Sequence, residues 1–326
     1  MLSPEIARMV SIIIVSHNRK KDLLECLESV RRLDYPSFET IVVDNGSTDG
    51  TVEILEKVNG NIRLVETGQD LGPAAAFNIG IRNSNGEFFL LLNDDVIIEK
   101  DTVTELVRVM ESDSRIGVAG ALIYFYSQPN RLWIYPPKYL AEKRIRSHLD
   151  VITAIGCAIM IKKAVIDRIG FFDTDYFLYH EEVDFCLRAR RQGFRVVCAL
   201  RSSVYHKIPV TPKREFGGHA TVNAYYGNRN FFLFAKKNYS GTKDRISFLF
   251  QSFLFYPELN SGIPQLRNFP WITPLKALMG LKVGFLAAYF RGIRAGMIWF
   301  LQHDTEKCHD RGTNLKLVTV PGHVSS

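Results

Sequence analysis

The sequence predicts an α/β fold in which helices flank a mostly parallel central sheet. Within the first 125 residues, apolar runs of strand length alternate with helical patterns in four successive units. Such alternation is typical of parallel strands joined by crossover helices. Polar residues follow several of these runs, as expected where the carboxyl ends of parallel strands open onto a ligand site. The chain of 326 residues is long enough for one large domain and a smaller appendage.

The spacing of apolar residues places the first elements. The predicted strands are residues 10–15, 39–44, 61–66 and 87–92, and the predicted helices are residues 20–33, a segment from residue 51, and residues 73–83.

Beyond these units the pattern changes twice. Residues 115–162 are strand-rich, with an aromatic and basic loop or flap expected over 126–148. A helix is predicted over 181–192, before Gly193 and the strand-like run FRVVCAL. The alternation stops near residue 235. We therefore expect a first domain over 1–235 and a helical, apolar and basic C-terminal extension over 236–326.

Composition narrows the class of protein. Hydrophobic residues make up 46% and charged residues 23% of the chain, which excludes a disordered protein. A net charge of +7 indicates an anionic partner: nucleic acid, a membrane surface or a phosphorylated substrate. The five cysteines form no CxxC pair, and the N-terminus lacks a secretory signal, so we expect a reducing, cytoplasmic location. Dinucleotide-binding and P-loop glycine motifs are absent.

Three polar clusters follow predicted strands. They are Ser16-His17-Asn18-Arg19, Asp44-Asn45 and Asn93-Asp94-Asp95. In the third, neighbouring carboxylates repel each other unless a cation or solvent relieves them, and Mg²⁺ or Mn²⁺ takes few protein carboxylates together with substrate phosphates. A capping turn before the next helix is the alternative for that cluster.

The acidic pair Glu181-Glu182 lies in a second kind of setting, among aromatic residues. Burial there would raise a carboxyl pKa towards that of a useful general base. The alternative is helix capping, since acids at a helix N-terminus are favoured by its dipole. Asp184 and Arg188 have the spacing of an ordinary i,i+4 ion pair.

The sequence resembles family 2 glycosyltransferases of the GT-A fold, close to rhamnosyl- and galactofuranosyltransferase-like members. The matching stretches, in family order over most of residues 10–235, are VSIIIVSHNR, IVVDNGSTDGT, GPAAAFNIGI, FFLLLNDDV, GCAIMIKKAVIDRIGFFD, FLYHEEVDFCLRARRQGFRV and YYGNRNFF. The resemblance implies an inverting transfer of a sugar from a UDP- or dTDP-sugar to a glycan or lipid-linked glycan acceptor, assisted by Mg²⁺ or Mn²⁺.

The resemblance also implies roles for individual residues. Asp44 matches the acid that contacts the pyrimidine base, and Asp95 matches the metal ligand of the DXD-like segment. Glu182 takes the position of the catalytic base, with Glu181 as the alternative. His206 resembles a histidine that completes the metal site. The remaining matched positions, expected to bind the nucleotide sugar, are Ser16, His17, Arg19, Asn45, Gly72, Asn93 and Asp94.

Several positions depart from the family pattern or leave a choice open. The base position carries Glu where the family usually has Asp, and the DXD-like segment opens with Asn93. Phe77 stands where many relatives carry a polar or basic residue. Arg229 in YYGNRN is expected to approach a phosphate or the acceptor, or else to serve a structural role.

Other functions stay open beside this one. A nucleotidyltransferase would also have a parallel sheet and a metal-assisted site. However, SHNRKK is not the glycine- and lysine-rich loop expected after the first strand of such an enzyme. A non-catalytic sugar-binding protein is a second alternative. A nucleic-acid binder has only the net charge in its favour, so we expect no nucleic acid partner. The sequence gives no indication of the donor sugar, the acceptor or the oligomeric state.

The apolar stretch 271–302 is interrupted by Lys282, Arg291 and Arg294, so it is too broken for a membrane-spanning helix. Two interpretations remain. It is a helical extension packed on protein, or an interfacial helix that lies on anionic lipid and gives the protein a peripheral membrane contact.

Overall fold

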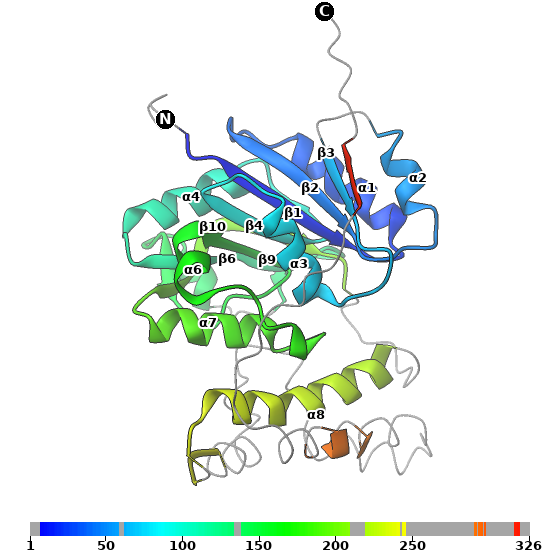
Figure 1. Ribbon diagram of the computed structural model, residues 1–326. Helices are drawn as coiled ribbons and strands as arrows, with labels where there is room; N and C mark the ends of the chain where they lie inside the picture. The colour runs from blue at the N-terminus through cyan, green and yellow to red at the C-terminus, as the bar shows by residue number, and fades with distance from the viewer. Residues whose placement is uncertain are drawn as a thin grey trace, which may run out of the picture.

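A single sheet organises the chain in the computed structural model (Figure 1). The structure describes residues 7–58, 62–133, 138–208, 219–241 and 243–245, with short pieces within 290–297 and at 316–319. The strands, in sheet order, are β11 (Lys316–Thr319), β3 (Ile62–Glu66), β2 (Phe38–Asp44), β1 (Val10–Ser16), β4 (Phe88–Asn93), β9 (Ala158–Lys162), β6 (Ile116–Phe125), β10 (Arg195–His206) and β5 (Val96–Ile98). Two further strands, β7 (Gln128–Leu132) and β8 (His148–Asp150), pair with β6 and β10.

Strand direction decides where a ligand site can form. Strands β1, β2, β3 and β4 are parallel neighbours. Strand β9 runs antiparallel to both β4 and β6, and β10 is parallel to β6, so β6 and β10 point the same way as β1. The carboxyl ends of these six strands therefore share one edge of the sheet.

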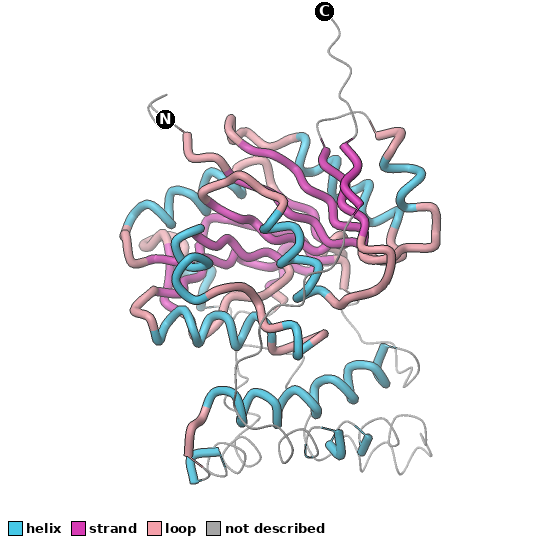
Figure 2. The backbone as a smooth tube through the Cα atoms, viewed as in Figure 1, coloured by secondary structure: helices cyan, strands magenta, loops and turns pink. Residues whose placement is uncertain are grey.

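Helices cover both faces, giving three layers (Figure 2). Alternate strand residues face opposite ways: Ile12 and Ile14 belong to the core under α1 (Lys20–Arg31), α2 (Thr51–Leu55) and α4 (Thr102–Ser112). Ile13 faces the other core, formed with α3 (Pro73–Arg82), α6 (Lys163–Ile169) and α7 (Glu181–Arg191). Both faces are buried, which explains why the central strands are continuous apolar runs.

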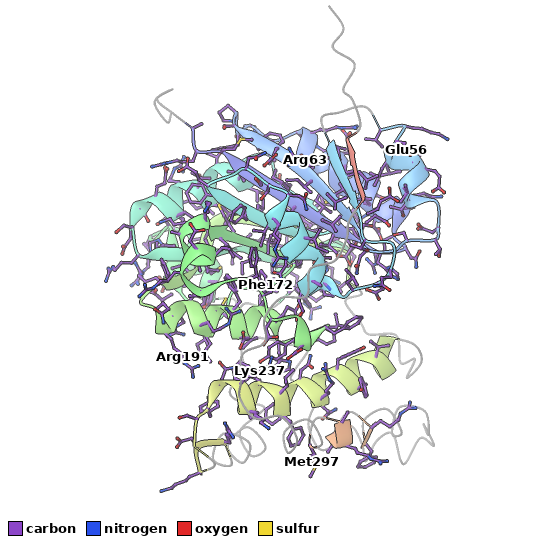
Figure 3. The ribbon with its side chains drawn as sticks, viewed as in Figure 1. Glu56, Arg63, Phe172, Arg191, Lys237 and Met297 are labelled. Carbon is purple, nitrogen blue, oxygen red and sulfur yellow. The ribbon has the colours of Figure 1, made fainter. Side chains whose placement is uncertain are left out.

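The last long helix of the described chain, α8 (His219–Asn238), packs beyond α7 and is tied to it by polar contacts (Figure 3). Arg191 on α7 donates to the carbonyl and side-chain oxygens of Asn238 at 2.6 and 3.1 Å. Lys237 pairs with Asp175 at 2.7 Å and with Asp173, on the segment that carries the short 3₁₀ helix η1 (Thr174–Tyr176). These contacts anchor α8 to the segment before α7.

The mostly parallel α/β fold expected from the sequence is confirmed, and several elements differ in detail. The expected loop over 126–148 contains β7, a short helix α5 (Lys138–Glu142) and the start of β8. Of the run VITAIGCAIMI, only the end forms a strand, β9. Strand β5 and helices α4 and α6 were not predicted.

The expected domain boundary at 235/236 lies inside α8, and the division into two domains stays a prediction. Most of the stretch 271–302, for which a packed or an interfacial helix was expected, lies outside the described residues. Within the described part of the chain, no helix is long and apolar enough to cross a membrane.

Candidate active site

Four strand ends bring the predicted polar residues to one edge of the sheet. In the parallel register, Ser16 pairs with Asp44 and Val15 pairs with Asn93. The backbone N–H of Asn45 donates to the carbonyl of Ser16 at 2.8 Å, which extends that pairing past the strands. A separate surface hollow of about 500 Å³, lined by residues 145–150 and Arg195, lies beside the opposite end of β10.

Asp94 is held against the end of β1. Its carboxylate accepts a hydrogen bond from the Ser16 hydroxyl at 2.8 Å, and its residue is only 6% exposed. Burial, with the neighbouring charge of Asp95, raises the pKa of Asp94 to about 7, despite the Ser16 hydrogen bond and the charge of Arg19. A positive charge bound beside Asp94 would therefore be stabilised by its carboxylate.

Asp95 joins residues that are far apart in sequence. One carboxylate oxygen accepts from the guanidinium of Arg19 at 2.5 Å, and the other lies 2.9 Å from Nε2 of His206, which is 111 positions away. The antiparallel pairing of β5 with β10 places Val96 opposite His206 and so brings these side chains together. Burial works against ionisation of Asp95, but the bonds and charges of His206 and Arg19 lower its pKa.

The surroundings of His206 favour the protonated, positively charged form of its imidazole ring. Burial opposes its protonation, but Cys157 and Asp95 together raise the pKa of His206 to about 10. Its Nδ1 is buried and has no hydrogen-bond partner among the described residues, and the edge of Trp133 covers the ring at a centroid distance of 4.8 Å.

Asp95 and His206 fit a divalent cation that is shared with a substrate. The described residues hold no group of three or more His, Cys, Asp or Glu side chains placed to bind a metal by themselves. Mg²⁺ and comparable hard cations, however, are commonly held by one or two carboxylates, with waters and substrate phosphates as the other ligands. The carboxylate of Asp95 meets that requirement, and Nε2 of His206, 2.9 Å away, would join it as a ligand where the cation replaces the proton on that nitrogen.

Asp44 presents an unused acceptor. Its residue is 2% exposed, and one carboxylate oxygen accepts the backbone N–H of Ser47 at 3.0 Å. The other oxygen is buried with no partner among the described residues. An unsatisfied buried acceptor is costly, so a ligand N–H that reached it would bind favourably. The expected contact of Asp44 with a pyrimidine base stays a prediction, and this oxygen is the atom available for it.

The side chains of His17 and Asn45 make hydrogen bonds that hold neighbouring loops in place. His17 Nδ1 lies 2.8 Å from the carbonyl of Asn45, so the proton is assigned to that nitrogen. The side chain of Asn45 donates to Asp70 at 2.7 Å and accepts from the backbone of Leu71 at 3.0 Å. Their expected contacts with a nucleotide sugar stay predictions.

Gly72 is the N-cap residue of α3 and lies at a point of close backbone approach. Its φ of 77° and ψ of 157° are allowed for glycine and disfavoured for other residues. A Cβ at this position would lie 2.5 Å from the carbonyl oxygen of Phe177. Gly72 therefore lets the segment before α7 pack against the start of α3, which the sequence-based role in nucleotide-sugar binding did not include.

Glu181 and Glu182 are the first two residues of α7. Burial raises the pKa of both carboxyls, and the charge of Glu182 raises that of Glu181 further. One oxygen of Glu181 is buried without a partner among the described residues. Glu182 lies against Gly156: a Cβ added at Gly156 would be 3.7 Å from the Cβ and Cγ atoms of Glu182. Both carboxyls therefore have the raised pKa expected of a general base.

The rest of α7 is fixed by the ion pair that its spacing predicted. Arg188 Nε donates to Asp184 at 2.7 Å, and its two terminal nitrogens donate to the carbonyls of Ile169 and Phe171 at 3.0 and 2.9 Å. Asp184 is 3% exposed and also accepts from Asn238 at 2.9 Å. The expected i,i+4 pair is confirmed, as part of a buried network.

Arg229 points its guanidinium at backbone. It donates to the carbonyl of Asp175 at 2.8 Å and lies 3.4 Å from that of Tyr176. These contacts favour the structural role expected as the alternative for Arg229. Acceptor binding by Arg229 stays a prediction. Phe77 is 5% exposed and packs near Phe172 at a ring-centroid distance of 6.5 Å, so it is a core residue. Asn230, in the motif YYGNRNFF, was not predicted as a site residue, yet its buried side chain contacts the segment before α7.

The fold is that of a GT-A glycosyltransferase. It aligns with the mannosyltransferase PcManGT from Pyrobaculum calidifontis in complex with GDP-Man and Mn²⁺, at a TM-score of 0.58 and 17% identity over 92% of this chain and 88% of that one. S. aureus TarS 1-349 in complex with UDP-GlcNAc aligns at a TM-score of 0.52 and 16% identity, over 89% of this chain and 92% of that one.

Sequence comparison identifies the family. Residues 11–170 match the profile of Glycosyl transferase family 2. The low-salt glycan biosynthesis hexosyltransferase Agl10 of Haloferax volcanii is 26% identical over 75% of this chain and 81% of its own length. The poly-beta-1,6-N-acetyl-D-glucosamine synthase of Staphylococcus epidermidis is 26% identical over 51% of this chain, and the match spans only 42% of that protein. The chain belongs to glycosyltransferase family 2, as the resemblance implied.

Proposed function

We propose that this glycosyltransferase is an inverting enzyme that moves a hexosyl or rhamnosyl group from a UDP- or dTDP-sugar to a glycan or lipid-linked glycan. The observation that carries the proposal is the difference in environment between the strand-end acid Asp95 and the two acids at the start of α7. Asp95 is ionised and paired with His206, whereas Glu181 and Glu182 have raised carboxyl pKa values. Separated environments of this kind are how one site combines charge binding with proton transfer.

Asp44 is proposed to hold the base of the donor. Its free buried oxygen is an acceptor for the N–H of a uracil or thymine ring. The similarity to chains solved with GDP-Man and UDP-GlcNAc supports a nucleotide-sugar donor in general, and the preference for a pyrimidine base rests on this carboxylate.

Asp95 and His206 are proposed to hold a divalent cation together with the donor diphosphate. When bound, Mg²⁺ or Mn²⁺ supplies positive charge that stabilises the leaving diphosphate. The Mn²⁺ in the PcManGT complex supports a metal of this class. Arg19, which contacts Asp95, adds a second positive charge at the same edge.

Glu182, or Glu181 in its place, is proposed as the general base. It takes the proton of an acceptor hydroxyl, whose oxygen attacks the anomeric carbon from the face opposite the diphosphate. The bond from the anomeric carbon to the phosphate oxygen breaks, and its electron pair leaves with the diphosphate. One displacement inverts the configuration, and general-base assistance contributes about 10²–10⁴-fold to the rate.

The experiment is a panel of UDP-, dTDP- and GDP-sugars assayed for nucleotide release with Mn²⁺, with and without a lipid-linked acceptor. We expect acceptor-dependent release of UDP or dTDP, its loss on EDTA treatment, and its loss in a folded Asp95→Ala variant. Release of pyrophosphate from a nucleoside triphosphate would instead indicate a nucleotidyltransferase. Binding of UDP without turnover of any donor would indicate a non-catalytic sugar-binding protein.

A further inference from the structure

The segment that leads into α7 has an unfavourable backbone conformation. Among the described residues, three of the four non-glycine residues with positive φ are Phe177 (57°), Tyr179 (70°) and His180 (74°). Such conformations are unfavourable for residues that carry a side chain, and they persist only where the surroundings hold them. Glu181 follows His180 directly. The conformation of this segment therefore sets the position of the first turn of α7 and of its two glutamates.

One side chain on α8 contacts most of this segment. Asn230 is 0% exposed, and its amide nitrogen lies 2.7, 2.7 and 2.8 Å from the carbonyl oxygens of Tyr176, Leu178 and Tyr179. Two N–H groups are thus shared among three carbonyls, of which that of Tyr176 also accepts the backbone N–H of Leu178 at 2.7 Å. Asn230 thus links α8 to a segment more than 50 positions earlier in the sequence.

The orientation of this amide is settled by its other partner. Its oxygen accepts from the guanidinium of Arg229 at 3.0 Å, and that same guanidinium donates to the carbonyl of Asp175. The reverse orientation would place an amide oxygen against three carbonyl oxygens and an N–H against a cation. Asn230 therefore acts as a donor to the segment, with Arg229 extending the contact by one residue.

We propose that Asn230 is a positioning residue for the general base. By donating to the carbonyls of residues 176, 178 and 179, it holds the left-handed conformation of Phe177, Tyr179 and His180, which fixes the position of Glu181 and Glu182 at the start of α7. Truncation would let the segment relax towards ordinary φ values and move the glutamates. The proposal rests on the function proposed above, in which one of these carboxylates takes a proton from the acceptor.

The test compares Asn230→Ala with Asn238→Ala. Asn238 is a matched control because it is also a buried asparagine of α8, 7% exposed, and its amide donates to Asp184 in the body of α7. Both variants lose a buried side-chain amide and are expected to lose thermal stability. A misplacement of about 1 Å costs on the order of 10²-fold in rate. We expect that loss in kcat for Asn230→Ala alone, with unchanged affinity for UDP or dTDP.

The pH profile separates positioning from general destabilisation. When the segment relaxes, the base becomes more exposed, so the pH at half-maximal kcat should fall in Asn230→Ala and stay unchanged in Asn238→Ala. If Asn230→Ala does not fold, Asn230→Asp takes its place, because it keeps the side-chain volume and the acceptor for Arg229 but has no N–H group. The same loss of kcat is expected.

Several results would overturn the proposal. One is wild-type kcat and pH profile in a folded Asn230 variant. Another is an equal fall of kcat in Asn238→Ala. Failure of both Asn230 variants to fold, with Asn238→Ala folded, would assign Asn230 a purely structural role. Absence of sugar transfer by the wild-type chain with every donor would instead refute the proposed function itself.

Discussion

Replacing Gly72 by alanine probes the contact between the start of α3 and the segment that carries the base. Two effects are combined at this position. The backbone has φ 77° and ψ 157°, a region that costs a non-glycine residue about 1–3 kcal/mol. In addition, the new Cβ would lie 2.5 Å from the carbonyl oxygen and 3.1 Å from the carbonyl carbon of Phe177.

Gly170 separates the two effects. It has φ 77° and ψ −168° at the end of α6, and a Cβ added there meets nothing within 4 Å. Gly170→Ala should therefore show the backbone cost alone. Since real Cβ atoms essentially never approach closer than 3.0 Å, Gly72→Ala must move Phe177 by at least the difference of 3.0 and 2.5, or 0.5 Å. A shift towards 1 Å at the base corresponds to a rate loss on the order of 10²-fold.

The assay measures thermal stability, nucleotide affinity and kcat for both variants. We expect Gly72→Ala to be less stable than Gly170→Ala and to lose up to about 10²-fold in kcat, with nucleotide affinity retained and Gly170→Ala near wild type in rate. Equal stability and equal kcat in the two variants would refute the argument from close approach. A fall in nucleotide affinity without a fall in kcat would return Gly72 to the nucleotide-binding role expected from the sequence.

Four further outcomes are expected. Because the base acts only when deprotonated and its pKa is raised, kcat should fall with decreasing pH well above the ordinary glutamate range. Glu182→Gln should lose at least about 10²-fold in kcat, and loss in Glu181→Gln with an active Glu182→Gln would reassign the base. Asp184→Ala should destabilise by about 3–5 kcal/mol in chemical unfolding, whereas Asp167→Ala, which removes an exposed pair, should change stability by less than about 1 kcal/mol. Cosedimentation with anionic liposomes should be lost on deleting residues 271–326; no binding, or binding unaffected by the deletion, would favour a packed extension.

The sequence by itself determined the architecture and the strand-end acids. Apolar runs of strand length alternating with amphipathic helices leave few arrangements other than a parallel sheet covered on both faces. Because the carboxyl ends of parallel strands share an edge, Ser16, Asp44 and Asp94 were bound to meet there, and the Ser16–Asp94 contact is observed. The i,i+4 pair of Asp184 and Arg188 was predictable for a similar reason, since helix geometry alone brings the two side chains together.

Only the tertiary structure decided what these residues contact. His206 reaches Asp95 because a three-residue strand, β5, pairs antiparallel with the end of β10, and a strand that short has no periodicity to reveal it. Asn45 and Arg229 carry side chains able to bind phosphate or sugar, yet the fold turns both towards neighbouring loops. Asn230 gains its role from a backbone conformation more than 50 residues earlier. Local patterns fix which elements form and which way they run, whereas hydrogen-bond partners depend on where distant elements pack.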